Sequence, residues 1–326
     1  MTTRSSRRHV VLAGVALGGF MLRGGSFAAT GYPSQRITYI SPYPPGATND
    51  SSARIVARAL SEMLGAAVIV ENRAGAGGTF GAEFVAKAAP DGYTLLNASS
   101  GNLSTAPQLV KVAFDPFRDL VPVGDVGASR SVIAVHPSVP VTSLQGLVAY
   151  ARDNPGKLNF GSAGTGSAGH IAGEYLKLRT GIDIVHVPYR GSAAAASDLI
   201  AGVIQIFIDP LAAAYVRAGQ VRGLAFYGIS SSDDLPGVPT IAEAGFPDWE
   251  LSSFFFIAVP AGTPADVVAI LNRSLRAIAL DPDSAKALKA LGLEPRLLSP
   301  EEVARQLRAE YEVNKRVIAA AKIPAG

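Results

Sequence analysis

Cysteine is absent from this chain of 326 residues, and histidine and tryptophan are scarce, with four histidines and a single tryptophan. Without a thiol, the chain has no disulfide framework, no thiolate nucleophile and no cysteine-based metal site. Charged residues make up only 17% of the sequence, and 29 basic residues nearly balance 26 acidic ones. This balance argues against nucleic acid or an anionic membrane surface as a partner.

The sequence also lacks an apolar run of the roughly 20 residues that a membrane-spanning helix needs. Its longest candidate, residues 10–22, follows the pair Arg7 and Arg8, and residues 26–28 then offer small side chains to a signal peptidase. This pattern predicts a twin-arginine export signal over residues 1–28, cleaved near Ala28, and a mature chain in the periplasm. A general secretory signal and a buried N-terminal helix are the alternatives.

Removal of that segment changes the charge of the protein. Residues 1–28 contain four arginines and no acidic residue, so the formal charge falls from +3 to −1. The mature chain of about 298 residues is too long for one small core and fits two domains of ordinary size.

Short apolar segments alternate with amphipathic ones along the rest of the chain, which favours parallel sheets covered by helices. The expected strands are residues 37–40, 68–70, 93–96, 121–126, 132–135, 158–161, 184–187, 204–208 and 224–227. The chain is then expected to end in helices over residues 265–280, 283–291 and 300–322.

Three loops rich in Gly, Ser, Thr and Asn join expected strands to expected helices: residues 42–50, 97–102 and 162–170. A helix N-terminus carries about half a positive charge and unpaired N–H donors, so such loops suit an anion such as a carboxylate. Helix capping, by Thr48 or Ser167 for example, explains any one of these loops by itself. Three in one chain favour a ligand site between two lobes.

One loop also contains a possible enzyme motif. A G-x-G-x-x-G match runs from Gly164 to Gly169, with Asp183 further along the chain. It has the context of a dinucleotide-binding turn, but a lone match is a weak signal. No G-x-S-x-G elbow, H-E-x-x-H pair or P-loop occurs. We therefore expect no catalytic residue, no cofactor and no metal site.

Three histidines and two aspartates are the remaining candidates. His136 and His186 lie at or within expected strands and are interpreted as structural, whereas for His170 helix capping and ligand contact both remain open. Asp50 and Asp209 are candidates for a paired-carboxylate site, although cap and strand-end hydrogen bonds explain them as well. A carboxylate ligand near two aspartates needs a proton or water between them, whereas an amine would pair with them directly.

Several motifs resemble those of a known family. Residues 45–50, with Arg54 four residues on, resemble the Pro-Gly-Gly-x-x-Asp signature of the Bug receptors, the substrate-binding proteins of tripartite tricarboxylate transporters. The resemblance covers essentially the whole mature chain and continues, in the family's order, through residues 71–78, 89–96, 186–191 and 235–245.

This resemblance implies an α/β fold of the type II periplasmic-binding-protein kind. Such a protein has two lobes, each a mostly parallel sheet flanked by helices, two crossover segments between them, a helical C-terminal tail and no catalysis. We expect residues 29–127 and 251–326 to form the first lobe and residues 128–250 the second. By the same resemblance, the three loops hold a carboxylate, partly through ordered water, and Asp209 faces the cleft.

Three residues depart from the family pattern. Ala47 stands where the family has a second glycine, which disfavours a positive φ there. Phe254 occupies the position of a tryptophan, and Ser231 that of an arginine. These departures bear on the shape of the pocket and the identity of the ligand, not on the fold.

We therefore predict an exported solute receptor. Tyr43 would form an apolar wall, Asp50 and Asp209 would order loops and waters, and His170 is a further candidate. The groups expected to hold the carboxylate are the amides and hydroxyls of Ala47, Thr48, Ser99, Thr165 and Gly166.

The predicted partners are a small organic acid and the membrane subunits of a tripartite tricarboxylate transporter. The alternatives are a periplasmic subunit that signals to a membrane kinase and an exported hydrolase or oxidoreductase. The sequence leaves open the oligomeric state and whether the ligand is a dicarboxylate, an aromatic acid, an amino acid or a neutral amide.

Overall fold

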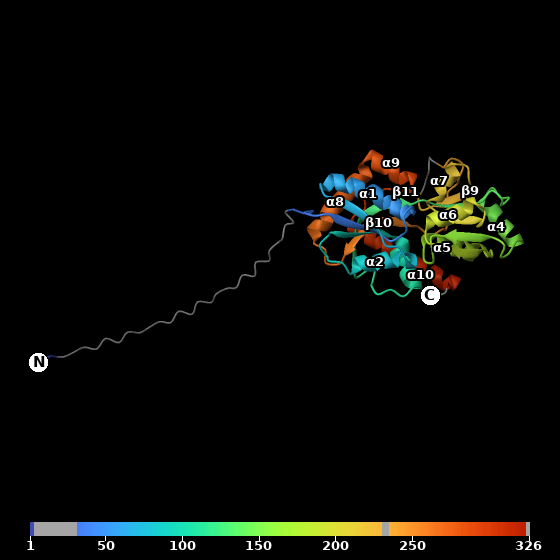
Figure 1. The fold of residues 1–326 in the computed structure, drawn as a ribbon. Helices are drawn as coiled ribbons and strands as arrows, with labels where there is room; N and C mark the ends of the chain where they lie inside the picture. The colour runs from blue at the N-terminus through green and yellow to red at the C-terminus, as the bar shows by residue number, and fades with distance from the viewer. Residues whose placement is uncertain (3–30, 230–234, 324–326) are drawn as a thin grey trace.

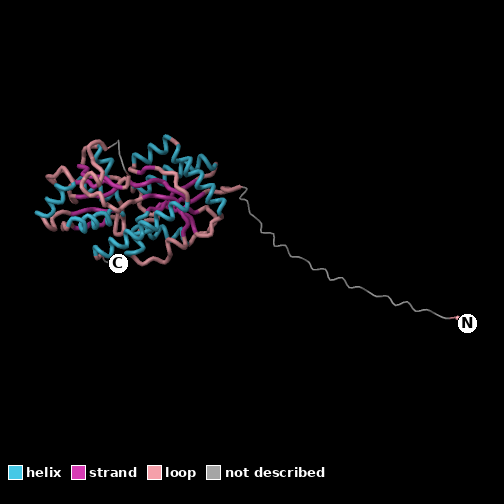
Figure 2. Tube along the Cα trace, turned by 180° about the vertical axis from the view of Figure 1, so that it is seen from behind, coloured by secondary structure: helices cyan, strands magenta, loops and turns pink. Residues whose placement is uncertain are grey.

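Two lobes lie side by side, each with a central sheet between layers of helices (Figure 1). Seen from behind, the strands occupy the middle of each lobe and the helices its outside (Figure 2). The computed structural model describes residues 1–2, 31–229 and 235–323. Residues 3–28 of the predicted export signal, and Ser231, lie outside the described residues. The predicted two-lobe α/β fold is confirmed.

The first lobe is built on a six-stranded sheet of order β11-β4-β10-β3-β1-β2. Strand β1 pairs in parallel with β2 and β3, whereas β10 pairs antiparallel with β3 and β4. The sheet expected to be mostly parallel is therefore mixed. Its strands are β1 (Ile37–Ser41), β2 (Val68–Asn72), β3 (Thr94–Ser99), β4 (Leu120–Ser129), β10 (Phe254–Pro260) and β11 (Leu293–Glu294).

Helices cover both faces of this sheet. On one side, α1, α8 and α9 share a core with the sheet, and α2 and the start of α10 do so on the other. Within the described residues, no helix has both the length and the apolar character that crossing a membrane requires. The helices are α1 (Thr48–Leu64), α2 (Thr79–Ala86), α3 (Ala106–Leu109), α8 (Ala265–Leu280), α9 (Pro282–Ala290) and α10 (Pro300–Ala321), with short turns η1 (Ala76–Gly78) and η2 (Gly101–Thr105).

Strand β10 lies in the middle of the sheet and is buried on both faces. Phe255 and Ile257 pack into the core beneath α1 and α8, whereas Phe254 and Phe256 pack into the core beneath α2 and α10. A strand with two buried faces is apolar without interruption, so it lacks the alternation that indicates a strand in a sequence. This is why the sequence did not predict β10.

The second lobe is built on a five-stranded sheet of order β7-β6-β8-β5-β9. Strand β6 pairs in parallel with β7 and β8, and β5 runs antiparallel to β8 and β9. The strands are β5 (Ser131–Val135), β6 (Asn159–Ser162), β7 (Val185–Pro188), β8 (Ile206–Asp209) and β9 (Arg222–Tyr227), and the helices are α4 (Leu144–Asp153), α5 (Ala168–Thr180), α6 (Ser192–Ile200) and α7 (Ala212–Arg217).

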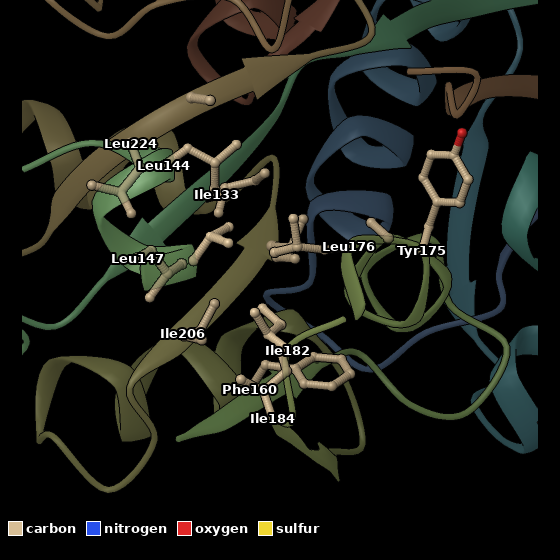
Figure 3. Close-up of a cluster of buried hydrophobic side chains, with 14 of the residues drawn as sticks. Ile133, Leu144, Leu147, Phe160, Tyr175, Leu176, Ile182, Ile184, Ile206 and Leu224 are labelled. Atoms are coloured by element: carbon tan, nitrogen blue, oxygen red, sulfur yellow. The ribbon is translucent and has the colours of Figure 1, made fainter. Parts of the chain in front are cut away.

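A large apolar core fills the space between this sheet and helices α4 and α5. Ile133, Phe160 and Ile206 project from three neighbouring strands toward Leu147 of α4 and Leu176 of α5 (Figure 3). Burying a side chain of this size is worth about 1.5–3 kcal/mol relative to leaving it exposed. This packing holds the strands in place, and with them the loops that follow the strands.

Three segments connect the two lobes. The first crossover is Arg130, which alone separates β4 from β5. The second crossover leads into β10, and just before that strand the carbonyl of Ser253 accepts a hydrogen bond from the Ser129 N–H at 2.8 Å. Helix α10 also reaches both lobes, because Val303 packs into the first core and Val317 into the second. The expected lobe boundaries stay a prediction.

Candidate functional site

Residues from both lobes line a cavity of about 50 Å³. Three helices begin at it: Thr48 of α1, Ala168 of α5 and Ser192 of α6 are their first residues and all line the cavity. Helix N-termini present unpaired N–H donors and a partial positive charge. Their convergence makes this cavity a place for an anion.

Helix α1 begins without a side-chain cap, because its N-cap residue is Ala47. Ala47 has a φ of −66°, so the alanine at this position adopts the backbone without strain. The Thr48 hydroxyl is buried and forms no hydrogen bond with the described part of the chain. A buried hydroxyl without a partner costs about 1–3 kcal/mol. Thr48 therefore has an unmet hydrogen bond that a ligand could complete.

Helix α5 presents a second set of donors from the opposite lobe. Its cap, Ser167, accepts a hydrogen bond from the His170 N–H at 3.4 Å. The N–H groups of Ala168 and Gly169 have no acceptor among the described residues, and both residues line the cavity. A Cβ on Gly169 would collide with the Ile208 carbonyl. Glycine at this position lets the helix start close against β8.

Asp209, the last residue of β8, is the one acidic residue among the described residues that line the cavity. Its carboxylate accepts hydrogen bonds from Ser192 Oγ at 2.7 Å and from the Leu211 N–H at 2.9 Å. Burial raises the pKa of Asp209 to about 6, and these hydrogen bonds only partly oppose that effect. Near neutral pH, Asp209 can therefore take up a proton when an anion binds beside it.

Tyr43 separates this cavity from a larger chamber. Its ring is buried, its hydroxyl donates to the Gly77 carbonyl at 3.1 Å, and burial raises its pKa to about 12. The second chamber has a volume of about 650 Å³ and shares Tyr43 and Ala163 with the smaller one. Thr165, predicted to hold the carboxylate, lines the second chamber and not the first.

Five of the nine predicted site residues line the small cavity: Tyr43, Ala47, Thr48, Ser99 and Asp209. Ser99 has an internal partner, since its N–H and hydroxyl both donate to Asn102 Oδ1.

Asp50 lies outside both chambers. Its carboxylate accepts hydrogen bonds from the Gly46 N–H at 3.0 Å, from Arg54, and from Asn72 Nδ2 at 2.7 Å. Burial raises the pKa of Asp50, but the hydrogen bonds from Arg54 and Asn72 outweigh burial, so the pKa lies below its usual value. These hydrogen bonds tie Asp50 to the loop that leads into α1, and its role at the site stays a prediction.

The expectation for Gly166 and His170 needs correction. Neither residue lines the two chambers, and the Gly166 N–H, expected to reach the ligand, donates to His170 Nδ1 at 3.2 Å. The His170 ring stacks on His186 with 3.9 Å between centroids, and burial lowers its pKa to about 4. His170 is therefore a neutral acceptor that holds the loop. The free amides belong to Ala168 and Gly169 instead.

Sequence reasoning missed a row of serines at the crossovers. Ser129 and Ser131 flank Arg130 in the first crossover, and Ser253 ends the second; all three line the cavity. Their separation in the sequence hides their proximity, which arises only when the two crossovers lie side by side. The signal in the sequence was the presence of serines close to the expected lobe boundaries.

The serine–histidine pair that could suggest catalysis lies outside the small cavity. Ser162 Oγ lies 2.7 Å from His186 Nε2, but neither side chain lines the cavity, and burial lowers the pKa of His186 to about 3. The G-x-G-x-x-G segment forms the turn into α5. Among the residues that the structure describes, no group of three acidic, histidine or cysteine side chains could hold a metal ion.

The comparisons with known proteins bear directly on this two-lobed site. A family model described as the tripartite tricarboxylate transporter family receptor, TctC, matches residues 52–323. The chain belongs to this family. Protein BugT of Bordetella pertussis is 37% identical over 279 residues, which cover 84% of this chain and 86% of that protein. The resemblance to Bug receptors found in the motifs is thereby confirmed.

A further relative is a UPF0065 protein from the tcbD-tcbE intergenic region of Pseudomonas sp. strain P51. It is 39% identical over 308 residues, which cover 94% of this chain and 92% of that protein. This chain and that relative thus match over nearly the whole length of both.

Solved structures share the fold. Rpa4515 of R. palustris with adipate has a TM-score of 0.85 and 35% identity, covering 90% of this chain and 99% of that one. MatC (Rpa3494) from Rhodopseudomonas palustris with bound malate has a TM-score of 0.81 and 29% identity, covering 88% of this chain and 100% of that one. The periplasmic binding protein BugD has a TM-score of 0.83 and 30% identity, covering 90% of this chain and 99% of that one.

Proposed function

We propose that this chain is an extracytoplasmic receptor that captures a small organic acid between its lobes and delivers it to a tripartite tricarboxylate transporter. The observation that carries the proposal is the convergence of the α1 and α5 N-termini, with the unpaired Thr48 hydroxyl, on one cavity between the two sheets. Solved relatives with adipate and with malate support an organic acid as the ligand.

In this proposal the carboxylate of the ligand lies between the two helix N-termini. The Thr48 amide and hydroxyl would donate from the first lobe, and the amides of Ala168 and Gly169 from the second. Each charge-assisted hydrogen bond contributes roughly 1.5–3 kcal/mol. Because the donors belong to different lobes, only a closed cleft brings them together on one anion. Asp209 would take up a proton or hold an ordered water beside that anion.

The lobe boundaries remain part of the same proposal. Residues 29–127 and 251–326 would move as one body and residues 128–250 as the other, with the crossovers at Arg130 and before β10 as the hinge. Helix α10 then has to bend or slide at one lobe, because its ends pack into different cores. Ligand binding would compact the molecule and raise its melting temperature.

The family and the leader sequence support the proposed location and partners. The pair Arg7 and Arg8 and the apolar run after it support export, and BugD is a periplasmic protein of the same fold. The partners would be the membrane subunits of the transporter, with no nucleic acid and no catalytic step. The donors that line the cavity suit an anion, which fits a receptor.

The proposal is tested with protein stripped of bound ligand by reversible unfolding. A panel of organic acids is screened by thermal shift, and each hit is titrated by calorimetry beside its own carboxamide. We expect at least one acid to bind with one-to-one stoichiometry, and its amide to bind about a hundredfold or more weakly, because the amide carries no charge. Equal binding of acid and amide, or no hit, would refute a carboxylate receptor.

Delivery is tested separately in the source bacterium. Deleting the gene should abolish uptake of the identified acid, and restoring the gene should restore uptake. Unchanged uptake combined with a lost transcriptional response to the acid would instead identify a sensor subunit.

A further inference from the structure

The apolar core of the second lobe includes side chains that lie outside residues 128–250. Val317 of α10 is 4% exposed and Leu109 of α3 is 1% exposed, and both are buried in this core. Val313 and Ile318 of α10 pack against it as well. Two helices from other parts of the chain therefore complete the second core.

Helix α10 is one uninterrupted helix of 22 residues that lies at the junction of the two lobes, beside α5 (Figure 1). Its only proline is Pro300, the first residue of the helix, and it contains no glycine. Sharp kinks in helices occur almost always at an internal proline, at glycine or where the helical hydrogen bonds are interrupted. We therefore expect α10 to move as a unit, with the lobe that holds it more firmly.

Directional hydrogen bonds fasten α10 to the first lobe. Asn314 Nδ2 donates to Ser104 Oγ at 3.0 Å and to Thr105 Oγ1 at 2.9 Å, and both acceptors belong to η2. From α3, Gln108 Nε2 donates to the Tyr311 carbonyl at 3.1 Å. The contact of the first lobe thus extends along α10 into the C-terminal half of the helix.

The second lobe holds α10 by apolar contact. Within the described residues, no hydrogen bond or ion pair joins α10 to residues 131–249. The second crossover does have polar links to the helix, because Ser252 donates to Glu310 and Arg316 pairs with Glu250. Apolar contacts have no preferred direction, and packed helices slide over one another in shear motions. The first lobe therefore carries α10 when the lobes separate.

We propose that α10 moves with the first lobe and that Val317 contacts the second core only while the cleft is closed. Burial of this apolar surface then holds part of the ligand-free protein closed. The closed form is the one that brings both sets of donors to one anion, so a larger closed fraction raises the apparent affinity. Val317 is thus a positioning residue that affects affinity without touching the ligand. This inference rests on the proposed function, because it takes closure of the lobes as part of binding.

The helix offers a matched pair of substitutions. Val317→Ala shortens a buried valine at the end of α10 in the second core, and Val303→Ala shortens one at the end in the first core. Each substitution leaves a cavity and should lower the melting temperature. Val317→Ala alone should open the cleft, because the contact of Val303 is the same in the open and closed forms. Val317→Thr keeps the shape of the side chain and buries a hydroxyl, so it should also open the cleft, and it replaces Val317→Ala if that variant does not fold.

Two measurements compare these variants with the unmodified chain. Small-angle scattering of protein stripped of ligand should give a larger radius of gyration for Val317→Ala than for the unmodified chain. Calorimetry uses the acid of the panel that binds the unmodified chain most tightly, and Val317→Ala should raise its dissociation constant about fivefold. Val303→Ala should match the unmodified chain in both measurements.

The outcomes separate this inference from the proposed function. Equal radii of gyration for all three proteins would refute the closure contact. Expansion of Val303→Ala without expansion of Val317→Ala would also refute it, and would assign α10 to the second lobe. If no acid of the panel binds but Val317→Ala alone expands, the proposed function fails and the closure contact stands.

Discussion

Gly77 of the first lobe lies directly against the Thr165 carbonyl of the second lobe, so that a Cβ on Gly77 would be 2.7 Å from that oxygen. A similar approach brings Gly166 against Ala106, where a Cβ would be 2.8 Å from the Ala106 Cα. The lobes therefore touch across the cleft through positions that have room only for a hydrogen atom. This is the arrangement expected of a closed receptor.

A methyl group at Gly77 should hinder closure. Gly77→Ala introduces both a clash with Thr165 and a strained left-handed φ of +66°. Gly65→Ala is the matched control, because Gly65 has the same φ of +66° with nothing within 4 Å of its Cβ position. We expect both variants to lose about 1 kcal/mol of stability. Calorimetry should show weakened ligand binding for Gly77→Ala alone, and equal weakening in both would contradict this role of the contact.

Thr48→Val should separate stability from binding. Valine keeps the shape of threonine and removes the buried, unpaired hydroxyl, so the ligand-free protein should be as stable as before, or more stable by up to about 1 kcal/mol. Ligand affinity should fall about tenfold, because the carboxylate loses a donor. Thermal unfolding and calorimetry measure the two effects.

Thr180→Val serves as the control for Thr48→Val. The Thr180 hydroxyl donates to the Leu176 carbonyl at 2.6 Å, so its removal should lower stability and leave affinity unchanged. A Thr48→Val protein that binds ligand as tightly as the unmodified chain would remove Thr48 from the site.

The affinity for an acid should depend on pH through Asp209. Burial raises the pKa of this carboxyl to about 6. A protonated Asp209 tolerates a neighbouring carboxylate and an ionised one repels it, so affinity should be high below that pKa and fall as the pH rises through it, by up to about tenfold per pH unit. Asp209→Asn should remove this dependence. Calorimetry across this range, in two buffers of different ionisation enthalpy, also counts the protons taken up.

The comparison with Asp209→Asn is needed because the protein has a second buried acid whose pKa is raised. Burial also raises the pKa of Asp125 to about 6, although Arg296 contacts it. Asp125 lies in β4 and does not line the cavity, so it should affect stability rather than affinity. A pH dependence of binding that persists in Asp209→Asn would assign the effect to another group.

Asp50 should act on the loop rather than on the ligand. Asp50→Ala leaves Gly46, Arg54 and Asn72 without their shared acceptor and should cost about 2 kcal/mol of stability. Because the pKa of Asp50 is lowered in the folded protein, its stabilisation is complete above the ordinary value and is lost as the pH falls through the folded one. Thermal unfolding at several pH values, with Asp50→Asn as the conservative variant, measures this. Abolished binding at unchanged stability would mean instead that Asp50 contacts a cationic ligand.

Much of the fold was predictable because its elements are locally encoded. The expected strands at residues 37–40 and 132–135 lie within β1 and β5, and the expected last helix, 300–322, corresponds to α10. Helix α10 carries its own start signal: Ser299 and Glu302 form a capping box. The antiparallel strands were not foreseen, because strand direction depends on pairing partners that are distant in the sequence.

The site was predictable as a set of loops and not as a set of contacts. Thr48 and Asp209 line the cavity, because strand ends and helix starts fall on one edge of each sheet. The sequence could not reveal that the Gly166 amide is taken by His170, since that bond depends on the rotamer of a buried ring. The pairing of Asp50 with Arg54 was accessible, because residues four apart share a helix face.

A crystal structure of the protein with its identified acid tests the central claim most directly. We predict one carboxylate of the ligand between the N-termini of α1 and α5, within hydrogen-bond distance of the Thr48 amide and hydroxyl and of the Ala168 and Gly169 amides. A ligand that places an amine on Asp209 and its carboxylate away from both helix N-termini would contradict the account.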